Sequence, residues 1–197
     1  MFKKNIIMPF VVLGDPDYNS SLKIIKTLID NGSGALELGF AFSDPIADGK
    51  VIQKANKRAL DNGITTLKAF ELLKEIRDYS EIPISIMLSY NLAYQHGLDS
   101  FYKKCHDLKI DAILFPDLPL EESDEVMQYS KKYSIDQIFM VSQITSEARL
   151  EKMDKLCSGY VYLVSRLGTT GTREKLNSNL KKLIEKTKRY FNIPIYV

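Results

Sequence analysis

A glutamate stands inside an apolar run of this sequence, where an acidic side chain is unexpected. Glu37 lies in the segment GALELG at residues 34–39. A β-strand there would put Leu36 and Leu38 on one face and Glu37 on the other. If helices cover the leucine face, Glu37 points into the interior of the sheet, where a carboxylate is costly unless it is paired or neutralised. Burial raises the pKa of a carboxyl group, so Glu37 is suited to donate a proton near neutral pH.

A second carboxyl group follows in a loop. Asp48 belongs to the segment SDPIADG at residues 43–49, whose proline and glycine favour turns. Glu37 would therefore stand on a rigid strand, and Asp48 on a loop able to close over a substrate. On the residues alone, two other interpretations stay open. Glu37 fits a structural ion pair equally well, and Asp48 fits a solvated turn residue.

Short apolar segments alternate with helical patterns along the whole chain. Seven segments have the composition of strands: residues 6–12, 34–38, 84–89, 111–115, 136–141, 160–165 and 193–197. Helical periodicity occupies residues 21–32, 67–76, 101–108, 150–156 and 180–184. Strict alternation of strand and helix predicts an α/β fold with a parallel sheet and right-handed crossovers.

Two architectures have this alternation, the doubly wound open sheet and the eightfold barrel. The first strand is followed by VLGDPD rather than by a glycine-rich nucleotide fingerprint, which disfavours a dinucleotide-binding open sheet. Active sites of barrels gather at the C-terminal ends of the strands. Those ends carry polar residues here, namely Asp15, Glu37, Asn91, Asp117 and the segment SRLGTTG at residues 165–171. The barrel is therefore favoured.

The composition bounds the class of protein and its partners. The 197 residues are 45% hydrophobic and 26% charged, and the formal net charge is +2, as expected for one globular domain. No basic run interleaved with aromatic residues favours nucleic acid, and the apolar runs are too short to span a membrane. Cys105 and Cys157 lack metal-ligand spacing, so we expect reduced thiols and a cytoplasmic location.

Several segments together resemble the alpha subunit of tryptophan synthase. They are PFVVLGDP, LELGFAFSDPIADG, PDLPLEES and YLVSRLGTTG, in the family's order. The resemblance implies an eightfold (β/α) barrel of the TIM type and the retro-aldol cleavage of indole-3-glycerol phosphate to indole and glyceraldehyde 3-phosphate. It also implies a partner beta subunit that holds pyridoxal phosphate in an alpha2-beta2 tetramer, and no cofactor or metal in this chain.

The resemblance assigns roles to individual residues. Glu37 matches the catalytic acid, which protonates the indole ring. Asp48 matches the second catalytic residue, whose carboxylate near the ring nitrogen would stabilise the cationic intermediate. Phe10 and Tyr162 match positions that line the substrate pocket.

Three further positions carry over from the family. Thr170 and Gly171 match the mobile loop after the sixth strand, where the threonine hydrogen-bonds the loop aspartate and the glycine amide meets the substrate phosphate. Asp117, in the segment PDLP, matches a loop position at the subunit interface. Two local departures, Ser89 and Ala41, stand where the family often has a tyrosine and a proline, and they affect the expected packing of the substrate.

The resemblance also leads us to expect a single barrel domain, residues 1–197, that stops after its seventh strand. In the family the chain continues with a glycine-rich loop, an eighth strand and a final helix, which contribute amides to the phosphate site. Two alternatives to the lyase therefore stay open. One is a non-catalytic module that keeps the contact surface for the beta subunit, and the other is a related barrel that binds a different phosphate compound.

Overall fold

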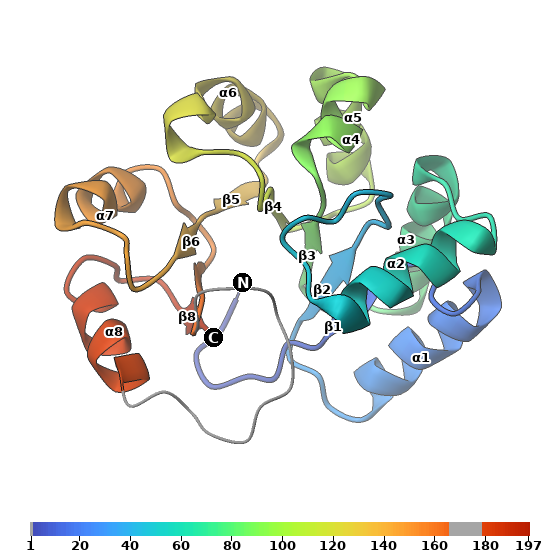
Figure 1. The fold of residues 1–197 in the computed structure, drawn as a ribbon. Helices are drawn as coiled ribbons and strands as arrows, with labels where there is room; N and C mark the ends of the chain where they lie inside the picture. Colours follow the sequence, from blue (N-terminus) through green and yellow to red (C-terminus); the bar gives the residue numbers. More distant parts are fainter. Residues whose placement is uncertain (1, 166–178) are drawn as a thin grey trace.

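Parallel strands occupy the centre of the molecule and helices surround them (Figure 1). The structure is a computed structural model that describes residues 2–165 and 179–197. Its first part comprises β1 (Phe10–Val12), α1 (Tyr18–Asp30), β2 (Leu36–Gly39), α2 (Lys50–Asp61), α3 (Thr66–Tyr79), β3 (Ile84–Met87), α4 (Tyr90–His96) and α5 (Leu98–Asp107). Its second part comprises β4 (Ala112–Leu114), the 3-10 helix η1 (Leu120–Glu122), α6 (Asp124–Tyr133), β5 (Asp136–Ile138), β6 (Met140–Val141), α7 (Glu147–Asp154), β7 (Val161–Leu163), α8 (Asn179–Thr187) and β8 (Ile195–Tyr196).

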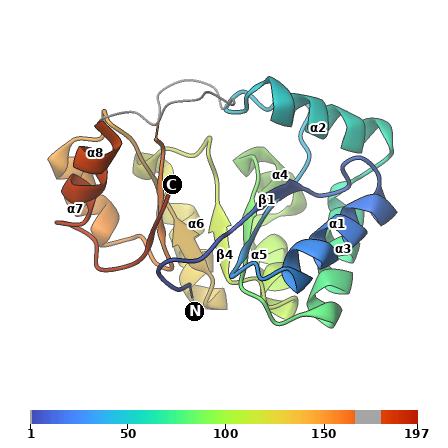
Figure 2. The same cartoon turned by 90° about the horizontal axis from the view of Figure 1, so that it is seen from below.

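The strands follow one another in chain order around the centre. Strands β1 to β5 form one parallel sheet, and β6 to β8 form a second parallel sheet. The helices lie outside these strands in both views (Figures 1 and 2). This arrangement agrees with the predicted barrel. Within the described ranges, none of the helices combines the length and the apolar character that crossing a bilayer requires.

One predicted strand is divided, and three helices were not predicted. Residues 136–141 form β5 and β6, separated at Phe139, because β5 pairs with β4 whereas β6 pairs with β7. The helices α2, α4 and α6 lie outside the helical patterns identified in the sequence. Alanines supply much of the buried face of α2, and such small apolar side chains give a weak periodic signal.

The two faces of β2 separate as the alternation of its side chains predicts. Leu36 and Leu38 are fully buried in the layer between the strands and the outer helices. Ala35 belongs instead to a cluster at the centre of the barrel, together with Phe2, Tyr160 and residues of β4 and β5. Glu37 therefore faces the interior of the barrel, as predicted.

A buried ion pair joins two connections at the N-terminal ends of the strands. The Arg77 guanidinium, at the end of α3, donates hydrogen bonds to the carbonyls of Ser80, Ile82, Leu108 and Lys109. It also contacts Asp111 at 3.4 Å, and the two side chains are only 8% and 13% exposed. Arg77 therefore satisfies carbonyls that would otherwise be left without donors in a region remote from the C-terminal ends of the strands.

Both cysteines are free thiols, as predicted. Cys105 is fully buried on α5, and Cys157 is partly buried just after α7.

Candidate active site

Three side chains form a row across the first strands of the barrel. In the parallel register, Phe10 on β1 is opposite Glu37 on β2, and Glu37 is opposite Ser85 on β3. Residues in register on neighbouring strands point to the same face of a sheet. Phe10, Glu37 and Ser85 therefore all face the interior of the barrel.

The carboxyl group of Glu37 is held by a hydrogen-bonded chain of side chains. The hydroxyl of Tyr160, just before β7, donates to Glu37 Oε1 at 3.1 Å. The same hydroxyl lies 2.9 Å from Ser85 Oγ. Because the Tyr160 proton is engaged by Glu37, Ser85 is the donor to Tyr160 when Glu37 is ionised. Glu37 is 4% exposed, and Ser85 and Tyr160 are fully buried.

The surroundings of Glu37 favour its protonated form. Burial raises the pKa of Glu37 from the ordinary 4.5 to about 7, and the hydrogen bond from Tyr160 opposes this rise in part. No basic side chain forms an ion pair with Glu37 among the residues that the structure describes. The geometry therefore favours a proton donor over the structural ion pair that the sequence left open.

The glycine that ends β2 makes room for an aromatic side chain. A Cβ atom on Gly39 would lie 2.7 Å from the Phe10 ring, closer than side-chain atoms approach one another. Gly39 therefore allows the Phe10 ring to lie against β2, two residues beyond Glu37 on the same face of the strand.

Asp48 is half-buried in the loop between β2 and α2 and is held from α2. The Asn56 side-chain amide donates to Asp48 Oδ2 at 3.3 Å, and the Gln53 amide donates to the Asp48 carbonyl at 2.9 Å. Burial raises the pKa of Asp48, and the hydrogen bond from Asn56 opposes this rise. Asp48 is thus anchored in the site rather than freely solvated.

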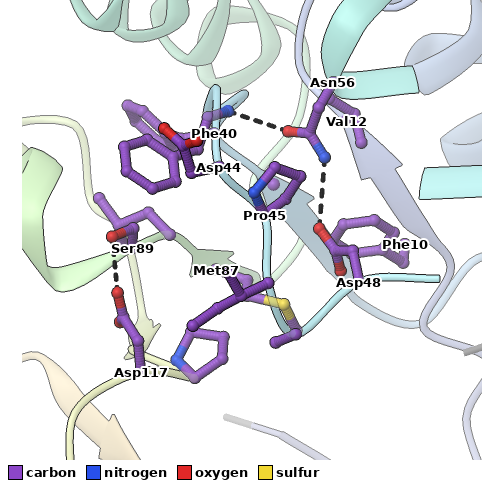
Figure 3. Close-up of a pocket in the computed structure, with 16 residues that line it drawn as sticks. Phe10, Val12, Phe40, Asp44, Pro45, Asp48, Asn56, Met87, Ser89 and Asp117 are labelled. Carbon is purple, nitrogen blue, oxygen red and sulfur yellow. Dashed lines mark hydrogen bonds between the residues drawn. The ribbon is translucent and has the colours of Figure 1, made fainter. Parts of the chain in front are cut away.

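A pocket opens at the C-terminal ends of β1 to β3 (Figure 3). It encloses about 610 Å³ of space, part of which is open solvent. Its lining residues are Phe10, Val12, Gly39, Phe40, Phe42, Asp44, Pro45, Ile46, Ala47, Asp48, Asn56, Met87, Leu88, Ser89, Pro116 and Asp117. Glu37 lies one layer deeper on β2, below Gly39. The pocket thus places apolar surface and the Asp48 carboxylate above the buried acid.

Tyr162 on β7 lies where the negative charges of both carboxyl groups raise its pKa. Its pKa is raised to about 12, first by burial and then by the negative charges of Glu37 and Asp48. Tyr162 is partly buried and packs against the cluster at the centre of the barrel, although it does not line the pocket described above. The structure therefore brings Tyr162 close to both predicted catalytic residues.

Asp117 lies at the rim of the pocket and caps a helix. Its carboxylate accepts a hydrogen bond from Ser89 Oγ at 2.6 Å (Figure 3) and another from the backbone amide of Tyr90 at 2.9 Å. These bonds join the loop after β4 to the first turn of α4. Ser89, one of the two departures noted in the sequence, thus serves as a partner of Asp117. The predicted phosphate-site residues Thr170 and Gly171 lie outside the described residues.

Three residues of this site were not identified from the sequence. The sequence is sufficient to identify Ser85 as a candidate, because it is a polar residue at an inward position of a strand. Tyr160 is 123 residues away from Glu37 in the chain, and nothing local links the two. Asn56 is a polar residue on the alanine-rich face of α2, a helix whose apolar periodicity in the sequence is weak.

Comparisons with known proteins show the family of this chain. A family model described as "Tryptophan synthase alpha chain" matches residues 2–197. This chain belongs to the tryptophan synthase alpha chain family. A tryptophan synthase alpha chain of Methanothermobacter thermautotrophicus is 45% identical over 190 residues, which cover 96% of this chain and 70% of the relative. One from Francisella tularensis is 46% identical over 184 residues, covering 93% and 68%.

Solved structures of the family have the same fold. A structure described as the tryptophan synthase a2b2 complex from Pyrococcus furiosus has a TM-score of 0.92 and 38% identity, over 99% of this chain and 78% of that chain. A tryptophan synthase structure from Mycobacterium tuberculosis, at 24% identity, has a TM-score of 0.90. The TIM-barrel architecture predicted for this member of the family is therefore confirmed. In the described parts of the chain, no group of three or more His, Cys, Asp or Glu side chains is arranged to hold a metal ion.

Proposed function

We propose that this chain catalyses the retro-aldol cleavage of indole-3-glycerol phosphate, with Glu37 as the acid and Asp48 as the stabilising anion. The observation that carries the proposal is the Glu37 carboxyl group, buried beneath the pocket with a pKa of about 7. An acid with such a pKa is protonated in a large fraction of molecules near neutral pH and still donates readily. Its neighbours Phe10 and Gly39 line the pocket above it.

The chemistry follows from the two carboxyl groups. Glu37 donates a proton to the indole ring carbon that bears the glycerol chain, and the ring becomes cationic. The Asp48 carboxylate stabilises this cation electrostatically. Glu37, now a carboxylate, accepts the proton of the adjacent glycerol hydroxyl. The bond between ring and chain then breaks, its electrons return to the ring, and an aldehyde forms on the departing glyceraldehyde 3-phosphate.

The partner in this proposal is a tryptophan synthase beta subunit, in an alpha2-beta2 tetramer. Support comes from the Pyrococcus furiosus neighbour, which is described as an a2b2 complex. We assign pyridoxal phosphate to that partner and no cofactor to this chain. Asp117 is proposed to lie at the interface, on the loop that it joins to α4. A cytoplasmic location is part of the same proposal and rests on the biosynthetic role of the family.

Cleavage of indole-3-glycerol phosphate, measured by release of indole with the beta subunit present, tests the proposal. Glu37→Gln and Asp48→Asn should each abolish release of indole while the folded state is kept. Glu81→Gln is the matched control, because the Glu81 side chain is 76% exposed and its ion pair with Lys109 lies at the surface. Near-normal turnover by Glu37→Gln would overturn the assignment of the acid. A wild-type chain that binds the beta subunit without releasing indole would favour the non-catalytic module.

A further inference from the structure

A buried asparagine lines the pocket from a helix face that is otherwise apolar. Asn56 is 4% exposed, and its neighbours on the buried face of α2 are Ala55 and Ala59. A buried amide is tolerated only when its hydrogen bonds are made. The bonds of Asn56 therefore show what this side chain does.

Among the described residues, the hydrogen bonds that the Asn56 side chain makes beyond its own helix go to the loop that carries Asp48. The side-chain oxygen accepts a hydrogen bond from the backbone amide of Phe42 at 3.0 Å. The side-chain nitrogen donates to Asp48 Oδ2 at 3.3 Å, and also to the Ile52 carbonyl at 3.0 Å within α2. Figure 3 shows the two bonds that leave the helix. One amide thus holds both ends of the segment 42–48.

We infer that Asn56 is a positioning residue for Asp48, fixing the loop over the pocket and directing the Asp48 carboxylate toward the site. This inference rests on the proposed function for its catalytic consequence. The segment 42–48 contributes Phe42, Asp44, Pro45, Ile46, Ala47 and Asp48 to the pocket wall. A change at Asn56 therefore acts on the shape of the pocket and on the position of its carboxylate together.

The electrostatic consequence has a definite direction. The hydrogen bond from Asn56 lowers the pKa of Asp48 against the opposing effect of burial. Among the described residues, Asp44 lines the same pocket, and the negative charges of Asp48 and Glu37 both raise the pKa of Tyr162. Without the Asn56 amide, the ionised form of Asp48 loses this hydrogen bond, and the pKa of Asp48 rises.

Two substitutions separate the contacts of Asn56. Asn56→Asp has nearly the same shape and keeps an oxygen for the Phe42 amide, but it replaces the donor to Asp48 by a second carboxylate. Asn56→Ser is shorter, adds no charge and leaves Asp48 without the amide, so it serves if the first variant does not fold. Asn62→Ser is the matched control, since Asn62 caps the other end of α2 and its side-chain amide donates to the carbonyls of Pro16 and Arg58.

Two measurements decide the inference. A carbon NMR titration of the Asp48 side chain, assigned by loss of its signal in Asp48→Asn, should show a higher pKa in both Asn56 variants and no change in Asn62→Ser. The kcat for indole release should fall about tenfold or more, from the loss of one hydrogen bond to a charged group. The acidic limb of the pH profile of kcat should move to higher pH, because Asp48 must be ionised for cleavage.

The outcomes distinguish this inference from the proposed function. If Asp48 titrates identically in the wild type and in the Asn56 variants, Asn56 does not position the carboxylate, even in a protein that cleaves its substrate normally. If the wild type releases no indole, the proposed function fails, and the titration still decides the role of Asn56. Equal losses of kcat in Asn56→Ser and Asn62→Ser, with an unchanged titration of Asp48, would show that Asn56 stabilises α2 and does not position Asp48.

Discussion

The stability of this protein should fall as pH rises between 4.5 and about 7, because of Glu37. Burial raises the pKa of Glu37 from the ordinary 4.5 to about 7 in the folded protein. Between these two values the unfolded chain releases the proton while the folded protein keeps it. The unfolded state then binds fewer protons than the folded state, so the free energy of unfolding decreases with rising pH. Above the folded pKa both states are ionised, and the contribution becomes constant.

The size of this effect follows from the shift in pKa. Each pKa unit corresponds to about 1.36 kcal/mol, so a rise from 4.5 to about 7 predicts a loss of about 3 kcal/mol. Folded domains of ordinary stability have about 5 to 15 kcal/mol in total. A loss of this size is therefore readily measured by urea unfolding at a series of pH values.

Glu37→Gln isolates the contribution of this one residue. Glutamine does not ionise, and its side-chain oxygen keeps an acceptor for the Tyr160 hydroxyl. The pKa values of Asp48 and Asp111 are also raised by burial, but both residues are present in both proteins and cancel in the comparison. The stability of the wild type relative to Glu37→Gln should fall by about 3 kcal/mol over this range. Parallel pH profiles, or a relative stability that rises with pH, would refute the buried, unpaired state of Glu37.

Three further predictions concern contacts around the site and at the opposite end of the barrel. Tyr160→Phe removes the hydrogen bond that Tyr160 donates to Glu37, so the pKa of Glu37 should rise above about 7. The alkaline limb of the cleavage rate against pH should then move to higher pH. An unchanged limb would show that Tyr160 does not influence the pKa of Glu37. Arg77→Leu leaves Asp111 buried without its ion-pair partner and should lower the free energy of unfolding by about 3 to 5 kcal/mol. The control Lys74→Leu, at an exposed ion pair, should change the free energy of unfolding by less than about 1 kcal/mol. Equal effects of the two substitutions in urea unfolding would contradict this account. Asp117→Ala removes both acceptors at the start of α4 and should lower the free energy of unfolding by about 1 kcal/mol. Hydrogen exchange at the Tyr90 amide should become faster. Unchanged exchange would show that the cap is not formed in solution.

The local pattern of apolar and polar residues was sufficient to predict much of the fold. The alternation of strands and helices predicted a parallel α/β architecture, because each element has its own hydrophobic period. The same reasoning put Leu36 and Leu38 outside and Glu37 inside, and both placements are found in the structure. Periodicity failed where its signal was weak, as in α2 with its buried alanines. It also failed within residues 136–141, where a change of partner strand divides one apolar run into β5 and β6.

The surroundings of the predicted catalytic residues depended on the tertiary structure. Glu37 itself is visible in the sequence, and the resemblance to the family supplied the predicted roles of Glu37 and Asp48. The hydroxyl that holds Glu37 comes from Tyr160, 123 residues further along the chain, and the amide that holds Asp48 comes from the buried face of α2. Side-chain periodicity describes which way a residue points relative to its own element. Which residues meet across the barrel depends on how the strands curl around the centre, and that is settled only when all of the elements pack together.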